Sequence, residues 1–345
     1  FHFWDKQFEK GMSDIFVLFS LISLIPIYYF LRYLWELLKL NDLENRAVFI
    51  TGCDSGFGRA LALKLAKNGL PVFAGCLTNG GAKSLEQETA GSGNQIKTVL
   101  VDVRSDESVF AAAKFVKENL KPSQKLWAIV NNAGIAHFQG PDAWTSMTAY
   151  QDTIEINTLG IVRGVHAFLP LLKQSKGRIV TVTSMLGRVP MPGLTAYSVS
   201  KFGAEAYMDC IRRELKPFGI TCSILEPGFF KTAVIPVEKL KAQVDKAWNN
   251  LDEKNKLDYG EKFKEKIIEI YTWHHENSAP IDWVVNDYYH AITARFPRLR
   301  YRSGWECLFS YIPSTFLPTE LGDYVMSKIL ISNVPAVLKK NKKSE

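Results

Sequence analysis

A run of six short apolar segments, each followed by a helix-like segment, constrains this chain more than any other feature of its sequence. Helix-like amphipathic stretches stand between the segments, for example at 57–68, 106–120 and 196–216. Strands that are apolar on both faces and alternate with helices are typical of a parallel sheet covered on both sides. The sequence therefore predicts an α/β fold, a doubly wound parallel sheet. The apolar segments are 46–51, 71–76, 96–103, 126–134, 177–184 and 220–228.

A glycine-rich turn lies between the first apolar segment and its helix, with the spacing G-x-x-x-G-x-G from Gly52 to Gly58. Glycines at such a turn allow the backbone to approach a pyrophosphate, and the N-terminus of the following helix attracts the negative charge. The turn therefore predicts a dinucleotide site. The residues of the turn that we expect to contact the cofactor are Gly52, Ser55, Gly56, Phe57 and Gly58.

The end of the second apolar segment bears on the choice between NAD and NADP. An acidic residue there binds the ribose 2′-hydroxyl, whereas an arginine binds a 2′-phosphate. The sequence reads Cys76, Leu77 and Thr78 at this place, and no basic residue lies within 52–58. The missing phosphate anchor favours NAD(H) over NADP(H).

A Tyr-x-x-x-Lys pattern follows the fifth apolar segment, with Tyr197 and Lys201 thirteen and seventeen residues after Ser184. Residues at i and i+4 share one helix face, so the ammonium of Lys201 is expected beside the phenol of Tyr197. Positive charge stabilises a phenolate, which is the base that oxidation of an alcohol needs. Ser184 is placed to stabilise charge that develops on the substrate oxygen.

These motifs together resemble the short-chain dehydrogenase/reductase family over roughly 46–232. The resemblance implies that Tyr197 is the acid/base, that Lys201 lowers its pKa and binds the ribose, and that Ser184 orients the substrate. It also implies that Asn157 holds a proton-relay water and that Asp102 contacts the adenine. The full set of cofactor residues implied beyond the glycine turn is Asp102, Val103, Asn131, Ala133, Gly134, Tyr197, Lys201, Pro227, Gly228 and Thr232.

Longer stretches, such as TGCDSGFG and RVPMPGLTAYSVSKFGAEAYMD, look like the branch that contains the retinol and 17β-hydroxysteroid dehydrogenases. That resemblance implies a membrane-associated oxidoreductase acting on a lipophilic alcohol or ketone, and pairing into a homodimer. Two alternatives stay open. One is a dehydrogenase of small hydroxy acids of the 3-hydroxybutyrate type, and the other is a non-catalytic NAD-binding membrane scaffold.

The two ends of the chain differ from its middle. Residues 15–31 carry no charge, and a bilayer-spanning helix needs about 20 mainly apolar residues, so 1–45 is predicted to be a membrane anchor, spanning or interfacial. A buried core helix is the alternative. The last residues, LKKNKKSE, supply four of the seven excess positive charges and resemble a dilysine retrieval signal. This resemblance implies the endoplasmic reticulum membrane, with the catalytic domain facing the cytosol.

The remaining chain is assigned to a catalytic domain at 46–335 and a basic tail at 336–345. Helical stretches at about 229–292 interrupt the rhythm of the sheet and are predicted to form a cap over the substrate. Trp248, Tyr259, Phe263 and Trp273 are expected either to line this cap or to pack within it. No basic stripe indicates nucleic-acid binding. The pair at 274–275 lacks partners at metal-ligand spacing, so no metal site is predicted.

Overall fold

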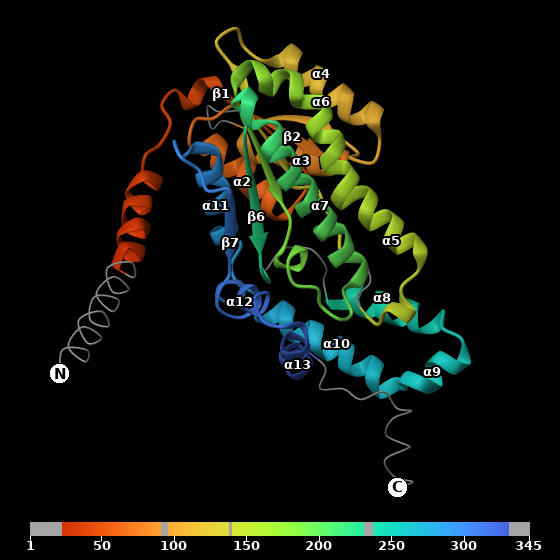
Figure 1. Ribbon diagram of the computed structural model, residues 1–345. Coiled ribbons are helices and arrows are strands. Elements are labelled where there is room, and N and C mark those ends of the chain that lie inside the picture. Colours follow the sequence, from red (N-terminus) through yellow and green to blue (C-terminus); the bar gives the residue numbers. More distant parts are fainter. Residues whose placement is uncertain (1–22, 91–95, 138–139, 231–236, 331–345) are drawn as a thin grey trace, which may run out of the picture. The chain divides into compact units, whose positions relative to one another are not determined.

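Figure 1 shows a computed structural model of the chain. Thr232 and the predicted basic tail lie outside the residues that the structure describes. The chain divides into two compact units, of which the smaller comprises Phe1–Asn41 with Thr293–Pro297 and the larger comprises Asp42–Ile292 with Arg298–Glu345. The described residues are 23–90, 96–137, 140–230 and 237–330.

In the smaller unit, residues 23–36 are helical. Arg32 Nε lies 3.0 Å from Glu36 Oε1 one turn further on. Beyond the helix, an antiparallel bridge joins residue 39 to residue 294, and the ring centroids of Trp35 and Phe296 are 5.8 Å apart. The predicted apolar run at 15–31 falls partly outside the described residues. Among the residues that are described, no helix is both long and apolar enough to cross a bilayer.

The larger unit is built on one sheet of seven strands, all parallel, in the order β3-β2-β1-β4-β5-β6-β7. The predicted doubly wound parallel sheet is thus confirmed, and six of its strands correspond to the six apolar segments. The seventh, β7, has the polar sequence RYRS and pairs with β6. The strands are β1 (Arg46–Thr51), β2 (Val72–Cys76), β3 (Lys97–Leu100), β4 (Lys125–Asn131), β5 (Arg178–Val182), β6 (Thr221–Pro227) and β7 (Arg300–Ser303).

Helices cover both faces of this sheet, and each face has its own apolar core. Side chains such as Leu61, Leu85 and Tyr288 pack on one face, and side chains such as Val109, Phe168 and Met208 pack on the other. The first face is covered by α2 (Gly56–Lys67), α3 (Asn79–Thr89) and α11 (Asp282–Thr293), and the second by α4 (Asp106–Asn119), α6 (Gly160–Ser175) and α7 (Thr195–Glu214).

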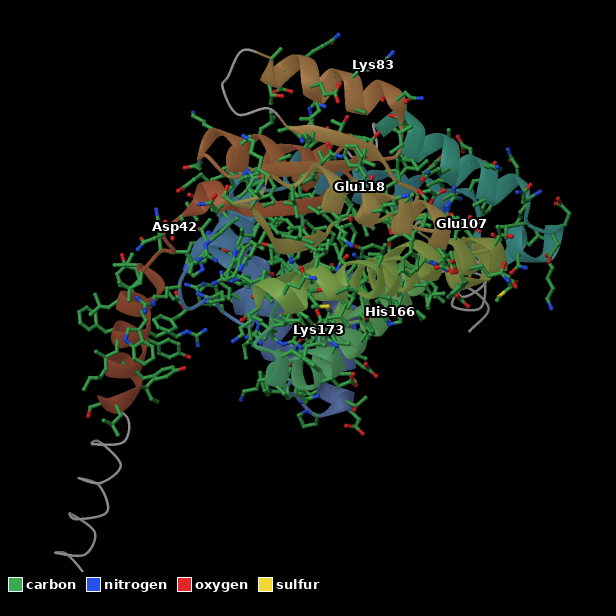
Figure 2. All side chains as sticks on the ribbon, turned by 90° about the horizontal axis from the view of Figure 1, so that it is seen from above. Asp42, Lys83, Glu107, Glu118, His166 and Lys173 are labelled. Atoms are coloured by element: carbon green, nitrogen blue, oxygen red, sulfur yellow. The ribbon has the colours of Figure 1, made fainter. Side chains whose placement is uncertain are left out.

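The outer faces of these helices are charged. Figure 2 shows Lys83 on α3, Glu107 and Glu118 on α4, and Lys173 on α6 pointing away from the sheet, and all four are exposed. Carbon-rich side chains fill the space between the sheet and the helices. The amphipathic patterning of the sequence therefore has its expected result, since apolar residues lie inside and charged residues face water.

The order of the strands reverses between β1 and β4. From β1 the chain first builds outward to β2 and β3, and then builds in the other direction from β4 to β7. In open α/β sheets, ligands bind in the crevice at the carboxyl ends of the strands at such a reversal. The glycine-rich turn after β1 and the turn after β4 both lie at this place.

The predicted cap corresponds to α8 (Val237–Asn249), α9 (Glu253–Tyr259) and α10 (Glu261–Glu276). Trp144, from the short helix η2 (Asp142–Trp144), lies in ring contact with Trp248, Tyr259 and Phe263 at centroid distances of 5.2, 5.3 and 6.1 Å. Three of the four aromatic residues expected in the cap thus pack around Trp144 as core, and Trp273 is exposed.

Shorter elements connect these parts. Two are π-helical turns, η3 (Glu155–Leu159) and η6 (Cys307–Tyr311). The others are η1 (Leu43–Asn45), α5 (Met147–Ile154), η4 (Met185–Gly187), η5 (Lys216–Phe218), α12 (Ile312–Ser314) and α13 (Thr319–Leu330).

Candidate active site

A cavity of about 730 Å³ lies at the carboxyl ends of the strands and extends beneath the cap. Its lining comes from the glycine-rich turn, the ends of β2 to β6, the start of α7, and the cap residues Leu240 and Tyr271. Most of the residues that the sequence singled out meet in this one cavity. They are Gly52, Ser55, Gly56, Phe57, Asp102, Val103, Ala133, Gly134, Ser184, Tyr197, Lys201, Pro227 and Gly228.

The glycine-rich turn has a shape that favours glycine at three of its positions. Gly52 and Gly56 have φ +72° and +61°, in the left-handed region that side chains rarely adopt. A Cβ on Gly58 would stand 2.5 Å from both the Gly52 carbonyl oxygen and Asn132 Nδ2. Gly58 does not itself line the cavity. Its missing side chain lets α2 pack closely against the turn.

The N-terminus of α2 is suited to a pyrophosphate. Ser55 occupies the N-cap position, but within the described chain its side chain accepts no hydrogen bond from the helix. The first N–H groups of α2 therefore lack a side-chain cap, and Ser55, Gly56 and Phe57 line the cavity beside them. Uncapped N–H groups and the helix dipole together attract an anion. This geometry fits the diphosphate of a nicotinamide dinucleotide.

The turn after β4 holds two asparagines with different roles. Asn131 donates to Thr181 Oγ1 at 3.2 Å within the sheet and does not line the cavity. Asn132 lines the cavity, donates to the Thr51 and Gly52 carbonyl oxygens at 2.9 and 3.2 Å, and accepts from the Tyr288 hydroxyl at 3.1 Å. Asn132 was missed among the sequence candidates, although it belongs to the same Asn-Asn-Ala-Gly motif.

Asn157 lies in the π-helical turn η3, close to Gly134 and Lys201. Its side chain accepts from Ile135 N at 2.8 Å, and it donates to Ile135 O at 2.8 Å and to Ser200 Oγ at 3.1 Å. These bonds join the loop after β4 to α7. A Cβ on Gly134 would lie 3.2 Å from Asn157 Oδ1 and 3.7 Å from Lys201 Nζ, so all three residues meet at one point.

Tyr197 and Lys201 lie on the first turns of α7, with Lys201 Nζ 5.4 Å from the centre of the Tyr197 ring. Lys201 Nζ also donates to Val182 O at 3.3 Å. Burial raises the pKa of Tyr197 to about 12, against the opposing effect of a hydrogen bond with Ser184. Burial lowers the pKa of Lys201 to about 8, and the charge of Glu205 opposes this shift. The pair thus lies in a desolvated site, where one added charge strongly changes the pKa of both groups.

Ser184 follows β5 and faces the same cavity. Its Oγ accepts from Leu186 N at 3.1 Å and donates to the Pro227 carbonyl oxygen over a long 3.5 Å. The first contact fixes the side chain at the start of η4, and the second is at the limit of hydrogen-bond length. Ser184 is therefore held next to Tyr197 by the local backbone.

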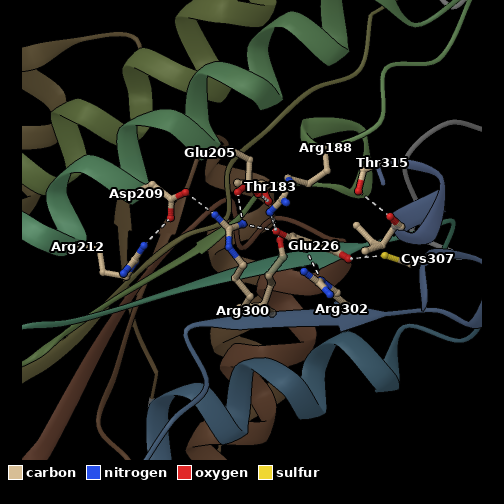
Figure 3. A network of polar contacts seen from close by, with 12 residues as sticks. Thr183, Arg188, Glu205, Asp209, Arg212, Glu226, Arg300, Arg302, Cys307 and Thr315 are labelled. Atoms are coloured by element: carbon tan, nitrogen blue, oxygen red, sulfur yellow. Dashed lines mark hydrogen bonds and ion pairs between the residues drawn. The ribbon is translucent and has the colours of Figure 1, made fainter. Parts of the chain in front are cut away.

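An ion cluster around two buried carboxylates, Glu205 and Glu226, lies at this end of the sheet (Figure 3). Glu205, one turn after Lys201 on α7 and only 5% exposed, accepts from the Thr183 hydroxyl and from Arg300 on β7. Arg300 also binds Glu226 on β6 and Asp209 on α7, and Arg302 binds Glu226. The cluster joins the strand ends next to Ser184 and Pro227 to the helix that carries Tyr197 and Lys201.

The members of this cluster were not among the sequence candidates. Glu205 carried a local signal, because an acid four residues after Lys201 shares its helix face. Arg300 lies 95 residues away from Glu205 in the sequence, so only the folded structure shows that they meet. Pairing of β7 with β6 brings Arg300 to this place.

Asp54 is a further residue that the sequence candidates missed. Although it belongs to the glycine-rich turn, its carboxylate lies at the end of β2, where it accepts from Leu77 N at 2.7 Å and from Thr78 N and Oγ1 at 3.0 and 2.7 Å. The sequence offers no acid at the end of β2 itself. The fold supplies one from the neighbouring turn.

Comparison with known proteins agrees with this site. The family model described as short chain dehydrogenase matches residues 46–242. A 3beta-hydroxysteroid dehydrogenase (dhs-16) from Caenorhabditis elegans is 41% identical over 94% of this chain and 87% of its own length. A 17-beta-hydroxysteroid dehydrogenase type 6 from Bos taurus is 39% identical over 89% and 96%, and a retinol dehydrogenase 7 from Rattus norvegicus is 38% identical over 89% and 95%.

Solved structures share the fold. A short chain dehydrogenase/reductase from Burkholderia phymatum in complex with NAD matches with a TM-score of 0.66 and 20% identity, over 79% of this chain and 94% of that chain. Together with the glycine turn, the Tyr-x-x-x-Lys pair and the parallel sheet, these matches identify the family. The chain belongs to the short-chain dehydrogenase/reductase family, in the branch of the retinol and 17β-hydroxysteroid dehydrogenases, and is an NAD(P)-dependent oxidoreductase of alcohol and carbonyl groups.

Proposed function

We propose that the protein is a membrane-associated, NAD-dependent dehydrogenase of a lipophilic alcohol, either a retinol or a hydroxysteroid. The observation that carries the proposal is that Ser184, Tyr197 and Lys201 meet in the same cavity as the glycine-rich turn, beneath a cap with an apolar lining. A bound nicotinamide dinucleotide supplies the acceptor for the hydride that leaves the alcohol carbon.

In the proposed mechanism, Tyr197 takes the hydroxyl proton of the alcohol while Ser184 donates a hydrogen bond to the same oxygen. Because burial raises the pKa of Tyr197 to about 12 even against the hydrogen bond with Ser184, the phenol needs nearby positive charge to act as a base near neutral pH. Lys201 supplies that charge. In the reverse direction Tyr197 returns the proton to the carbonyl oxygen.

Asn157 is proposed as the residue that holds the route by which this proton leaves the site. Its bonds to Ile135 and Ser200 fix the loop after β4 against α7, next to Lys201. A water chain from Lys201 to solvent requires a rigid polar anchor at this point, and the amide of Asn157 provides it.

The preference for NAD over NADP is proposed on the charges at the adenosine end of the cavity. Asp54 brings a carboxylate to the end of β2. The nearby cations are engaged, since Arg104 binds Asp102 at 2.7 Å and Arg59 binds Glu88 at 2.6 Å. A 2′-phosphate would therefore meet a negative charge, whereas a 2′-hydroxyl would find an acceptor.

A lipophilic substrate is favoured by the other end of the cavity, where Leu194, Phe229, Phe230 and Leu240 form the lining. The relatives named as retinol and hydroxysteroid dehydrogenases support the same class. A small hydroxy acid would need a cation for its carboxylate. Among the described lining residues the only cations are Lys201, which the chemistry uses, and Arg104, which is bound to Asp102.

Association with the endoplasmic reticulum membrane, with the catalytic domain facing the cytosol, is proposed from the two ends of the sequence. Residues 15–31 are uncharged and the last seven residues carry four lysines. Exposed aromatic side chains near the C-terminal end, Trp305, Phe309 and Phe316, are of the type that favours a bilayer interface. Pairing of two copies is proposed on the family resemblance, with Val199 and Phe202 exposed on α7.

The test uses the full chain purified in detergent, with NAD⁺ and two substrates, all-trans-retinol and a hydroxysteroid. We expect NADH formation with at least one of them, and loss of about 10³-fold or more in kcat for Tyr197→Phe with an unchanged unfolding midpoint. Tyr207→Phe, on the same helix but outside the cavity lining, is the matched control. Turnover of 3-hydroxybutyrate with no rate on either lipid would refute the substrate class.

A further inference from the structure

The cap places one polar group at the substrate end of the cavity, the hydroxyl of Tyr271 on α10. Apolar residues of the same lining include Leu194, Phe229 and Leu240. Among the described residues, no hydrogen bond or ion pair involves the Tyr271 hydroxyl. Burial raises the pKa of this phenol.

A hydroxyl that a bound ligand covers without a hydrogen bond is costly. Leaving such a group unpaired costs about 1 to 3 kcal/mol, and most buried polar groups in proteins therefore have a partner. The Tyr301 hydroxyl illustrates the usual case, since it lies 2.8 Å from His290 Nδ1 and accepts from Arg298 N at 2.9 Å. Tyr271 differs in that it lines the cavity, where water pairs with its hydroxyl until a ligand displaces that water, and the ligand must then supply the partner.

The position of Tyr271 relates it to the substrate rather than to the cofactor. Its hydroxyl oxygen is the nearest atom to a Cβ built on Gly193, at 3.4 Å. Gly193 lies in the loop between Ser184 and Tyr197, and Gly140 N donates to its carbonyl oxygen at 2.9 Å. The adenosine end of the cavity, with Asp54 and Asp102, is formed by other elements.

Tyr271 is also held firmly enough to recognise a ligand. It stands one turn after Ile267, which packs with Trp144, Val244 and Trp248 in the core of the cap. The Tyr271 ring packs against the same cluster. A rigid aromatic anchor on a helix loses little conformational freedom when a ligand binds.

We propose that the Tyr271 hydroxyl binds a second oxygen of the substrate, at the end remote from the reacting carbon, so that the preferred substrate is a hydroxysteroid with two oxygens. A retinol carries a single oxygen, which the reaction uses, and leaves Tyr271 unpaired. This inference rests on the proposed function and narrows it from lipophilic alcohols to dioxygenated steroids.

The test combines two enzymes with two pairs of substrates. The enzymes are the wild type and Tyr271→Phe, which removes one oxygen atom and keeps the ring. The substrates are androstan-3-ol with and without a 17-ketone, and androstan-17-ol with and without a 3-ketone, each with NAD⁺. Tyr259→Phe is the matched control, since its ring packs on Trp144 and does not line the cavity.

For the wild type we expect kcat/KM to be about 10-fold or more higher for the steroid with the second oxygen, and Tyr271→Phe to remove this difference, mainly through KM. The control should keep it. An equal loss on both members of a pair, or no loss on either, would overturn the role of Tyr271.

The two failures can be told apart. If the wild type oxidises none of the steroids and no retinol, the proposed function fails. If it oxidises them without regard to the second oxygen, only the inference on Tyr271 fails. This comparison uses the wild type alone, so it can refute the inference on Tyr271 even where Tyr271→Phe does not fold.

Discussion

Removing the charge of Asp54 should relax the choice between NAD⁺ and NADP⁺. The change Asp54→Asn keeps the size of the side chain and one acceptor oxygen for Thr78, and it abolishes the negative charge at the end of β2. If that charge excludes the 2′-phosphate, the ratio of kcat/KM for NAD⁺ to kcat/KM for NADP⁺ must fall in the variant.

The size of the effect follows from electrostatics. A phosphate carries a charge of about −1.5 to −2 at neutral pH, and at ~5 Å from a carboxylate it is repelled by about 5 to 7 kcal/mol at an effective dielectric constant of about 20. In bulk water the same pair is repelled by about 1.2 to 1.7 kcal/mol. Because Asp54 is partly exposed, we expect about 1.5 to 3 kcal/mol, which is about a 10- to 150-fold change in the ratio.

The assay measures initial rates with both cofactors at a fixed saturating concentration of alcohol, at low and at high salt. Salt screens exposed charges, so the discrimination of the wild type should weaken as ionic strength rises, and that of Asp54→Asn should not. Glu118→Gln is the matched control, because it removes one exposed acid on α4 far from the cavity lining. A third variant, Glu88→Gln, releases Arg59 from its ion pair and should improve NADP⁺ use independently.

Two results would refute the reasoning. One is a wild type that uses NADP⁺ as well as or better than NAD⁺, since the carboxylate would then not act against the phosphate. The other is an Asp54→Asn variant that retains the wild-type ratio while it remains folded. A parallel loss with both cofactors would mean that Asp54 only supports the turn through Leu77 and Thr78.

Two further predictions concern the catalytic end of the site. Glu205 opposes the effect of burial on Lys201, whose pKa is lowered to about 8, so Glu205→Gln should lower that pKa further. The ammonium of Lys201 would then be lost at lower pH, so the alkaline limb of the kcat/KM profile should move to lower pH. Glu205→Asp should recover part of this shift. Glu214→Gln, at the exposed end of α7, should not cause it. A Cβ at Gly58 would stand 2.5 Å from the Gly52 carbonyl oxygen, so Gly58→Ala should displace the turn. We expect it to weaken NADH binding by about 10-fold or more, measured by fluorescence titration. The control Gly80→Ala, whose Cβ would meet no atom within 4 Å, should leave NADH binding unchanged.

The sequence predicted those parts of the fold that depend on local pattern. The apolar runs that became β1, β2, β5 and β6 are almost wholly buried on both faces, so their composition alone indicates a parallel sheet, whereas β3 at the edge of the sheet is partly exposed. The glycine turn and the Tyr197–Lys201 pair each lie within seven residues of chain, where spacing determines geometry. Residues joined only by the fold were not predictable in this way.

Three cases show the limit in physical terms. β7 reads Arg-Tyr-Arg-Ser, and its strand character comes from pairing with β6 and from the ion pairs of its arginines rather than from apolar content. Asp54 lies in a turn whose glycines explain its shape, and nothing local indicates that its carboxylate bonds to the end of β2. Trp248 looked equally suited to the cap lining and to the cap core, and its contact with Trp144, 104 residues away, places it in the core.

The two ends of the site are stabilised by different kinds of interaction, and this bears on how the branch diversifies. At the chemical end, the buried carboxylates of Glu205 and Glu226 converge on Arg300, and loss of one partner would leave an unpaired buried charge that costs about 3 to 5 kcal/mol. That end therefore tolerates little change. At the substrate end, Trp144 holds the cap by aromatic packing, which accepts swaps of similar volume at lower cost. Substitutions in α8 and α10 can thus change which alcohol is bound while the arrangement of Tyr197 and Lys201, on which the proposed proton transfer depends, stays intact.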